Sequence, residues 1–164
     1  MLKGIPKIIS PELLKVMMEM GHGDELVIGD GNFPGQSVNP NCIRCDGHNV
    51  PELLEAILKL YPLDTYQLPV YIMAKTPGDT VETPIWDEYA KIIKPYTDKE
   101  IEQIERFEFY ERAKKAYAVV MTGESALYAN IILKKQAEDA YAMLQSGKTM
   151  EEVAIAYDMD PDSC

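Results

Sequence analysis

Hydrophobic and polar positions change their spacing along the chain, and these changes predict a series of helices and strands. Residues 10–18, SPELLKVMM, begin with an N-cap serine, a proline in the first turn and an acid near the positive end of the helix dipole. The leucine and methionine residues that follow recur at helical spacing, and a glycine at 21 or 23 ends the helix. The chain therefore starts with an amphipathic helix that has one apolar face.

The chain then alternates between strand-sized apolar runs and helical patterns. Strands are predicted at the apolar segments 25–29, 69–75, 116–121 and 129–135, with a shorter one around Ile43. Helical spacing recurs over 51–61, 84–94 and 106–117. This alternation predicts an α/β protein with helices on the faces of a sheet. Ligands of such sheets bind where strand ends meet loops, which here are the polar turns around residues 30, 76 and 122.

The composition narrows the classes of partner. The net charge of −11 and the sequence pI of about 4.6 make nucleic acid and anionic membranes unfavourable partners. No run approaches the ~20 apolar residues that a membrane helix requires, and prolines and charges interrupt any signal-peptide pattern in residues 1–15. Three cysteines cannot all pair within one chain, which is typical of reduced thiols. These features predict a cytoplasmic protein without a nucleic-acid or membrane partner.

Ionisable residues lie at both ends of the strand predicted at 25–29. His22 and Asp24 precede it and Asp30 follows it, so the histidine, whose ordinary pKa is ~6.5, has acids nearby in sequence. The alternative is that His22 caps the preceding helix and the aspartates serve turn geometry. A straight strand of this length spans roughly 13 Å, so His22 and Asp30 do not easily hold one small ligand from opposite ends. Either the chain folds back, or a site combines groups from different subunits.

A second candidate site is the C-x-x-C pair of Cys42 and Cys45, which His48 follows. The pattern suggests a zinc or redox module, but a structural zinc site needs four ligands, and His22 would have to supply the fourth across a long loop. The alternative is that the two cysteines are small apolar residues on a short strand.

Two further segments mix polar and aromatic residues. The segment 106–117, RFEFYERAKKAY, fits an amphipathic helix with Phe107, Tyr110 and Tyr117 near the core. In TGESALYAN, Tyr128 and Asn130 lie on one face of any extended segment. Tyrosine and asparagine suit a sugar, because they offer donors and acceptors together with a flat apolar surface.

The end of the chain differs in character from the rest. Residues 137–164 carry seven acids and one base. Apolar residues recur at helical spacing on both sides of Gly147. The pattern predicts two short helices that form an acidic helical extension, residues 137–164, to a domain of residues 1–136.

Long stretches of the chain resemble the L-fucose mutarotase family, which is related to the bacterial D-ribose pyranases. They follow in order from about residue 2 to residue 135 and are LKGIPKIISPELLKVMMEMGHGDELVIGDGNFPG, IRCDG, YPLDTYQLP, TPIWDEY, ERFEFYERAKKAYAVVMTGE and ALYANIILKK. The resemblance implies a single three-layer α/β domain, a mixed sheet with helices on both faces. Family members generally stop soon after the last stretch, so the acidic extension lies outside the resemblance.

The resemblance also implies an activity. The family converts sugar anomers through the open-chain aldehyde, without cofactor or metal, and its members are homo-oligomers, from dimers up to decameric rings, with sites at subunit interfaces. Opening a hemiacetal needs a proton delivered to the ring oxygen and one removed from the anomeric hydroxyl, which general acid/base catalysis supplies. The expectation is an isomerase, a mutarotase of L-fucose or a similar aldose. The alternatives are a non-catalytic sugar-binding protein and a zinc or redox module that uses Cys42 and Cys45.

Carried onto this chain residue by residue, the resemblance assigns site roles. It makes His22 the proton donor, with Tyr110 and Asp64 as further catalytic candidates. The substrate contacts that it implies are Asp30, Met73, Arg106, Tyr128 and Asn130. The chain departs from the family at Ala129, where glycine is usual and the methyl group is expected close to the sugar. Cys42 and Cys45 stand where the family has small apolar residues, which argues against a zinc site.

Overall fold

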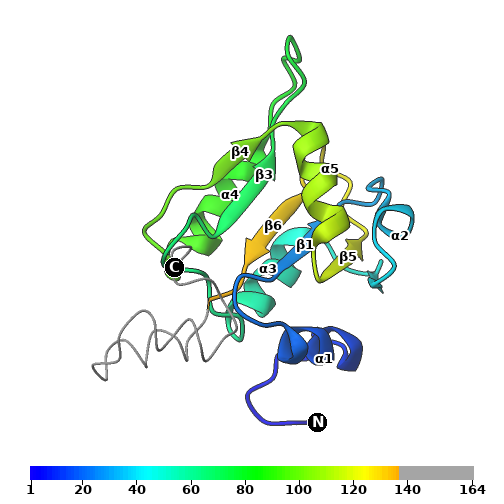
Figure 1. The fold of residues 1–164 in the computed structure, drawn as a ribbon, viewed down its shortest axis with the longest axis vertical. Helices are drawn as coiled ribbons and strands as arrows, with labels where there is room; N and C mark the ends of the chain where they lie inside the picture. The colour runs from blue at the N-terminus through cyan, green and yellow to red at the C-terminus, as the bar shows by residue number, and fades with distance from the viewer. Residues whose placement is uncertain (137–164) are drawn as a thin grey trace.

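The computed structural model describes residues 1–136, and its elements follow the predicted alternation (Figure 1). The helices are α1 (Pro11–Glu19), α2 (Gly35–Val38), α3 (Val50–Leu58), α4 (Pro84–Ile93) and α5 (Arg106–Lys115). The strands are β1 (Glu25–Gly29), β2 (Cys42–Cys45), β3 (Val70–Met73), β4 (Glu102–Ile104), β5 (Ala118–Thr122) and β6 (Ile131–Lys134). The expected acidic extension, residues 137–164, lies outside the described residues.

Two elements were not predicted from the pattern. Helix α2 is a single turn inside a loop rich in proline, glycine and asparagine, and β4 has two exposed polar residues and one buried isoleucine. Neither is long enough to set up a hydrophobic period. Strand β4 forms because its backbone pairs with β3, with Ile72 opposite Gln103 and Met73 opposite Ile104.

The strands form one six-stranded mixed sheet in the order β2-β5-β1-β6-β3-β4. Strand β6 runs antiparallel to both of its neighbours, and the other strands run parallel to one another. In the register, Ile28 lies between Val120 and Ile131. The carboxyl ends of the parallel strands and the start of β6 therefore share one edge of the sheet. We call this the carboxyl edge, and the opposite one, where Glu25 pairs with Lys134, the amino edge.

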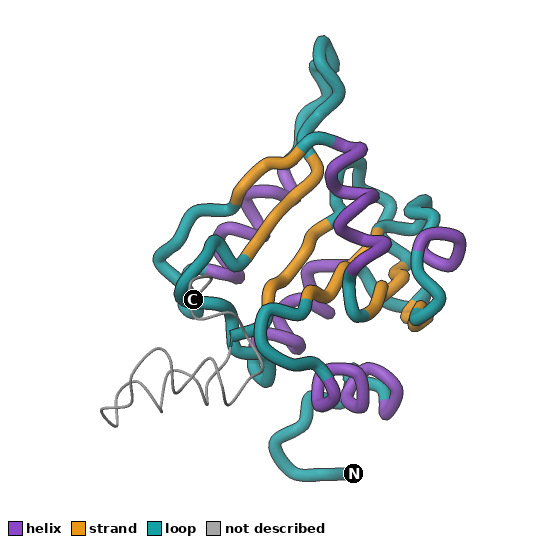
Figure 2. Tube along the Cα trace, viewed as in Figure 1, coloured by secondary structure: helices purple, strands orange, loops and turns teal. Residues whose placement is uncertain are grey.

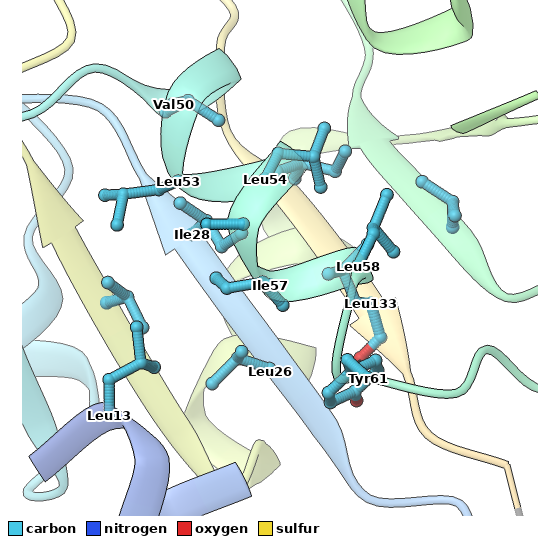
Figure 3. Packing of buried hydrophobic residues seen from close by; sticks show 14 of the residues in the cluster. Leu13, Leu26, Ile28, Val50, Leu53, Leu54, Ile57, Leu58, Tyr61 and Leu133 are labelled. Atoms are coloured by element: carbon cyan, nitrogen blue, oxygen red, sulfur yellow. Dashed lines mark hydrogen bonds between the residues drawn. The ribbon is translucent and has the colours of Figure 1, made fainter. Parts of the chain in front are cut away.

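Alternate residues of the strands point to two separate hydrophobic cores, as the period of two in a strand requires. Leu26 and Ile28 pack with residues of α1, α3 and α4 on what we call the α3 face (Figure 3). Val27 packs on the opposite side of the sheet, the α5 face, with residues of α5 such as Phe109. Helices thus cover both faces (Figure 2), and the three-layer prediction is confirmed.

Side-chain caps explain where two of these helices begin. The backbone N–H of Leu13 donates to Ser10 Oγ at 3.1 Å, as the opening sequence pattern predicts. At α3, Asn49 and Glu52 form a reciprocal capping box, with N···O distances of 3.0 and 2.9 Å. Among the helices of residues 1–136, none combines the length and apolar character needed to cross a bilayer.

Candidate active site

A pocket of about 280 Å³ opens at the carboxyl edge of the sheet, where α/β folds place their ligands. Its volume is close to the lower end of the range for small-molecule sites. The residues that line it come from five different segments of the chain, and they are Asp30, Asn32, Phe33, Met73, Asp79, Tyr110, Leu127, Tyr128 and Asn130. Five of the eight residues expected in the site therefore meet in one place, namely Asp30, Met73, Tyr110, Tyr128 and Asn130.

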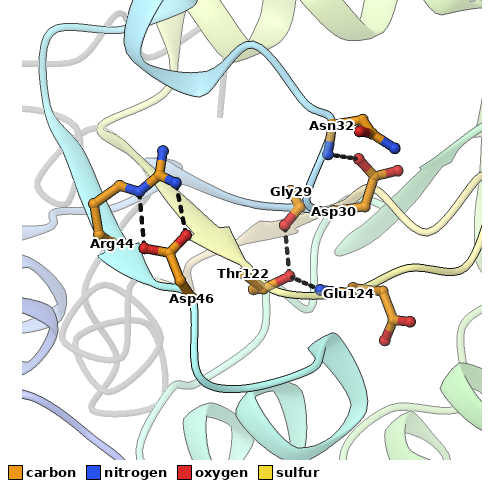
Figure 4. Close-up of polar contacts among 7 residues, drawn as sticks. All are labelled: Gly29, Asp30, Asn32, Arg44, Asp46, Thr122 and Glu124. Atoms are coloured by element: carbon orange, nitrogen blue, oxygen red, sulfur yellow. Dashed lines mark hydrogen bonds and ion pairs between the residues drawn. The ribbon is translucent and has the colours of Figure 1, made fainter.

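Asp30 and Asn130 form the polar floor of the pocket. The two residues are only 8% and 6% exposed, and the backbone N–H of Asp30 donates to Asn130 Oδ1 at 2.8 Å. This bond fixes the amide of Asn130 so that its oxygen is occupied and its Nδ2 group is left to donate. The Asp30 carboxylate accepts the backbone N–H of Asn32 at 3.0 Å (Figure 4). The floor thus presents both an acceptor and a donor to a ligand.

Burial changes the acid–base character of Asp30. Desolvation raises the pKa of this carboxyl group, and the charge of Glu124 adds to the effect. Backbone hydrogen bonds from Asn32 and Phe33 oppose the shift without cancelling it. A carboxyl group whose pKa moves toward neutrality in a cleft is suited to accept or release a proton.

Hydrogen bonds of the Thr122 side chain hold the ends of β1 and β5 together next to Asp30. The hydroxyl of Thr122 donates to the carbonyl of Gly29 at 2.8 Å and accepts the backbone N–H of Glu124 at 3.1 Å (Figure 4). The next turn needs a glycine, because a Cβ at Gly123 would lie 2.2 Å from the Asp46 carbonyl oxygen. These contacts set the position of Asp30 relative to the neighbouring loop.

A strained corner at the start of β6 carries the side wall of the pocket. Tyr128 has a φ of 56°, which a non-glycine residue rarely adopts. Two side chains of α4 hold its backbone, since Trp86 Nε1 donates to the Tyr128 carbonyl at 2.8 Å and Tyr89 Oη to the Ala129 carbonyl at 2.6 Å. Backbone strain that the surrounding structure holds in place is common at ligand sites.

The Ala129 methyl group does not lie where the resemblance suggested. Ala129 is fully buried and belongs to the core on the α3 face. Its neighbours Tyr128 and Asn130 point the other way, into the pocket. The expectation that this methyl group lies close to a ligand is therefore wrong, because Ala129 packs into the core while the residues on either side of it line the pocket.

An aromatic wall of the pocket comes from α5 and from the loop after β1. The rings of Tyr110 and Phe33 have centroids 5.7 Å apart, and Phe33 in turn meets Phe109 edge to face at 5.8 Å. Phe109 is fully buried, whereas Phe107 is 62% exposed. The expectation that Phe107 packs near the core is thus wrong, because α5 turns Phe109 toward the sheet.

His22 lies at the amino edge, away from the pocket. The neighbouring Gly23 donates its N–H to the Lys135 carbonyl at 2.9 Å, beyond the end of β6. His22 does not cap α1, because Lys135 Nζ donates to the carbonyl groups of Met17 and Met20, each at 2.7 Å. His22 Nδ1 is buried and has no hydrogen-bond partner among the described residues. Buried polar side-chain atoms usually have a hydrogen-bond partner, so this ring nitrogen is an exception.

Asp64 and Arg106 also lie outside the pocket. Asp64 is 2% exposed and sits at the amino edge, where its N–H donates to the Lys134 carbonyl at 3.0 Å. Arg106 begins α5 at the carboxyl edge, but it is exposed, with its guanidinium carbon 4.7 Å from the centroid of the Phe107 ring. The described chain therefore brings together one part of the expected site and leaves His22 and Asp64 at the opposite edge.

The cysteine pair has the wrong geometry for one metal or one disulfide. Cys45 packs into the core on the α3 face, and Cys42 packs against the core on the α5 face. Their side chains are therefore on opposite sides of β2. Burial raises the pKa of both thiols, which keeps them protonated and poorly nucleophilic. This placement favours the interpretation of two small apolar residues on a short strand.

Asn32, Phe33, Asp79 and Leu127 line the pocket without having been predicted there. The turn after residue 29 was a signal for Asn32 and Phe33, because loops at strand ends carry ligand contacts. Asp79 follows the polar turn around residue 76, which was predicted as a place for ligands, although the residue itself was not singled out. It lies in the loop of residues 74–83, which projects from the carboxyl edge between β3 and α4 (Figure 1).

Fold and pocket together define a three-layer α/β protein with a ligand site of mixed polar and aromatic character at the carboxyl edge of its sheet. The chain belongs to the RbsD / FucU transport protein family, whose sequence pattern matches residues 3–138.

Individual relatives agree in sequence and in structure. The chain is 55% identical over 141 residues to a zebrafish (Danio rerio) protein named fucose mutarotase, and the match covers 82% of this chain and 92% of that protein. A crystal structure of the Streptococcus pneumoniae fucose mutarotase in complex with L-fucose has a TM-score of 0.78 and 52% identity, covering 82% of this chain and 98% of that one. The crystal structure of FucU from Bifidobacterium longum has a TM-score of 0.80 and 57% identity, covering 82% and 99%.

Proposed function

We propose that the protein is a mutarotase, an isomerase that interconverts the α and β anomers of L-fucose or a similar aldose by ring opening. The observation that carries the proposal is the pocket at the carboxyl edge, in a chain half identical to a protein that binds L-fucose. Asp30 and Asn130 at its floor offer an acceptor and a donor, and Tyr110 and Tyr128 offer aromatic surfaces with hydroxyl groups. Such groups select a sugar because an unmatched buried polar group is costly.

The reaction itself needs two proton transfers. One proton goes to the ring oxygen, and another leaves the anomeric hydroxyl, so a positioned acid and base near neutrality serve both directions. Asp30 and Tyr110 lie in the pocket, and the raised pKa of Asp30 fits a group that exchanges protons. The proton donor assigned by resemblance is His22, which the same copy of the chain holds at its amino edge.

We propose that the active site is completed between two copies of the chain. The amino edge of one copy would bring His22 and Asp64 to the carboxyl-edge pocket of another. The placement of His22 supports this arrangement, because the residue is only partly buried and lies at the amino edge, away from the pocket of its own chain. The protein is accordingly a homo-oligomer in this proposal, and light scattering at micromolar concentration should give a mass well above the 18.5 kDa of one chain.

The test of the activity is exchange NMR on L-fucose. Cross-peaks between the two anomers should intensify when catalytic amounts of the protein are added, with D-ribose and D-galactose as comparison sugars. A sugar-binding protein without catalysis would change the line widths or chemical shifts of fucose but leave the exchange rate at its spontaneous value. No acceleration with any of the three sugars would refute the mutarotase proposal.

Asp30→Asn should separate binding from stability. The amide keeps an oxygen for the Asn32 N–H but loses the charge, so L-fucose affinity should fall about tenfold, the scale of one hydrogen bond to a charged group. Because folding raises the pKa of Asp30, the ionised carboxylate destabilises the folded state. The cost begins when the pH rises above the pKa that Asp30 has in the unfolded chain, and it is complete above the pKa that Asp30 has in the folded state. Below both pKa values the carboxyl group is protonated in both states, and the cost is absent. Asp30→Asn should therefore be more stable than the wild type at pH 7, and this gain should vanish near pH 3.

Calorimetric titration with L-fucose and urea unfolding at the two pH values measure these effects. Ser37→Ala, on the exposed side of α2 near the same loop, is the control for substitution in general. Unchanged affinity in Asp30→Asn would remove this residue from the sugar contacts.

The cysteines should prove dispensable for the reaction. The double variant Cys42→Ala, Cys45→Ala removes one sulfur from each core and should lose about 1 kcal/mol of unfolding free energy, a small cavity effect. Its exchange rate should equal that of the wild type, and metal analysis should find no zinc in either protein. Stoichiometric zinc that disappears in the double variant would revive the metal-site interpretation.

Two further parts of the proposal concern the cellular compartment and residues 137–164. We propose a cytoplasmic protein, because Cys42 and Cys45 are free thiols, as is usual in a reducing compartment. We also propose that residues 1–136 carry the activity by themselves, since every residue assigned to the site lies within them. The acidic residues 137–164 would then be an appendage to that domain.

A further inference from the structure

The Asp79 carboxylate is a part of the pocket that the assigned site roles do not include. Asp79 lies in the loop of residues 74–83 and lines the pocket beside Tyr128, which is 49 positions away in the sequence. The Tyr128 hydroxyl donates a hydrogen bond to Asp79 Oδ2. This contact connects the projecting loop to the wall of the site.

The loop holds the carboxylate in place by its own backbone. Val81 N–H donates to Asp79 Oδ1 at 2.9 Å, and Asp79 N–H donates to the Thr76 carbonyl at 3.0 Å. The hydrogen bond from Tyr128 lowers the pKa of Asp79 below its ordinary value, so this group is ionised at neutral pH and only accepts. The direction of the bond between the two side chains is thereby settled.

This arrangement uses up the donor capacity of Tyr128. A phenol has one O–H, which Tyr128 donates to Asp79, and the backbone N–H of Thr76 donates to the same phenol oxygen at 3.3 Å. The remaining lone pair of Tyr128 Oη is available to accept a hydrogen bond from a ligand. Because Trp86 and Tyr89 already fix the backbone of this corner, the contact with Asp79 is what sets the orientation of the hydroxyl itself.

We propose that Asp79 is a positioning residue that holds the Tyr128 hydroxyl as a hydrogen-bond acceptor for one sugar hydroxyl. The inference rests on the proposed mutarotase function, because it concerns how that same pocket binds the hydroxyl groups of its substrate. Asp79 acts through Tyr128, so the two residues should behave as one unit when sugar binding is measured. Its main effect should fall on affinity and less on the exchange rate at saturating sugar, since the contact is made in the bound sugar before and after ring opening.

A double-mutant cycle tests the proposal in the full-length protein. Asp79→Ala, Tyr128→Phe and the double variant are each titrated with L-fucose by calorimetry, and exchange is measured by NMR at saturating sugar. Asp79→Ala should weaken binding about two- to tenfold, the scale of one hydrogen bond. In the Tyr128→Phe background the same substitution should change the affinity by less than about twofold, because the group on which Asp79 acts is gone.

Two matched variants separate positioning from loss of structure or charge. Glu82→Ala removes an exposed acid from the same loop without touching the pocket lining, and it should bind as the wild type does. Asp79→Asn keeps an oxygen that can accept the Tyr128 proton, and it should recover most of the affinity that Asp79→Ala loses. The proposal is overturned if Asp79→Ala binds like the wild type. Equal losses in both backgrounds also overturn it, because Asp79 would then act without Tyr128.

The two readouts keep this proposal distinct from the proposed function. If the wild type binds L-fucose without accelerating exchange, the mutarotase proposal fails, while the binding cycle still measures the coupling between Asp79 and Tyr128. If exchange is accelerated and the cycle is additive, the positioning proposal fails alone. A wild type that neither binds nor converts L-fucose refutes both.

Discussion

Replacing His22 with alanine is expected to slow α–β exchange of L-fucose about a hundredfold or more while leaving the fold intact. A positioned general acid contributes typically ~10²–10⁴-fold, and His22 is the assigned proton donor. The fold should survive because His22 lies in a turn, and its Nδ1 makes no hydrogen bond within the described residues. Exchange NMR gives the rate, and circular dichroism and light scattering verify folding and assembly. His22→Gln should be equally slow, because glutamine does not titrate near neutrality.

His48 provides the matched control, because it is the other histidine of the chain. Its Nδ1 lies 3.2 Å from Glu52 Oε1 at the start of α3, on the exposed surface. His48→Ala should retain the wild-type exchange rate. A folded, assembled His22→Ala protein with near wild-type exchange would remove His22 from its catalytic role.

The same variant tests whether the site is shared. His22→Ala keeps an intact pocket at the carboxyl edge, and Asp30→Ala keeps an intact amino edge, so each supplies what the other lacks. Coexpressed or co-refolded, the two should form mixed oligomers with some complete sites and recover exchange that neither has alone. Mixed oligomers that stay inactive would show that His22 serves the pocket of its own chain, or does not serve one.

Phe109→Ala is expected to lose about 3–5 kcal/mol of unfolding free energy, the usual cost of removing a fully buried phenylalanine. Phe109 has no exposed surface and packs edge to face against Phe33, which lines the pocket. The cavity should therefore also loosen the aromatic wall and weaken L-fucose binding. Urea unfolding at one fixed protein concentration and calorimetric titration measure the two effects.

Phe107→Ala on the same helix is the control for this prediction. Its ring is 62% exposed, so its removal should change the unfolding free energy by less than about 0.5 kcal/mol. Similar losses at both positions would mean that α5 does not present Phe109 to the sheet as described. A stable Phe109→Ala protein would likewise contradict the packing on the α5 face.

Much of the fold could be predicted from local sequence because its signals are local. The serine at position 10 and the proline after it define the start of α1, and apolar runs of strand length define β1, β3, β5 and β6. Strand β4 was not predicted, because a segment with one buried residue among polar ones has no hydrophobic period to detect. It exists through pairing with β3, which is a contact between distant parts of the chain.

The candidate site divides in the same way. Asp30 could be predicted because it follows an apolar strand. Tyr128 and Asn130 could be predicted from their spacing and from the resemblance to a known family, although Tyr128 itself lies in a turn. Their meeting in one pocket, and the separation of His22 and Asp64 from it, depend on the antiparallel course of β6. Strand direction follows from how the whole sheet assembles, and no local pattern encodes it.

The sequence by itself thus determined which residues are apolar, which begin helices and which can exchange protons. Only the tertiary structure decided that Asp79 meets Tyr128, that Phe109 and not Phe107 faces the sheet, and that Cys42 and Cys45 lie on opposite sides of β2. The physical reason is that propensity and hydrophobic period act over a few residues. Side-chain partners across the molecule are chosen by packing, which depends on every element at once.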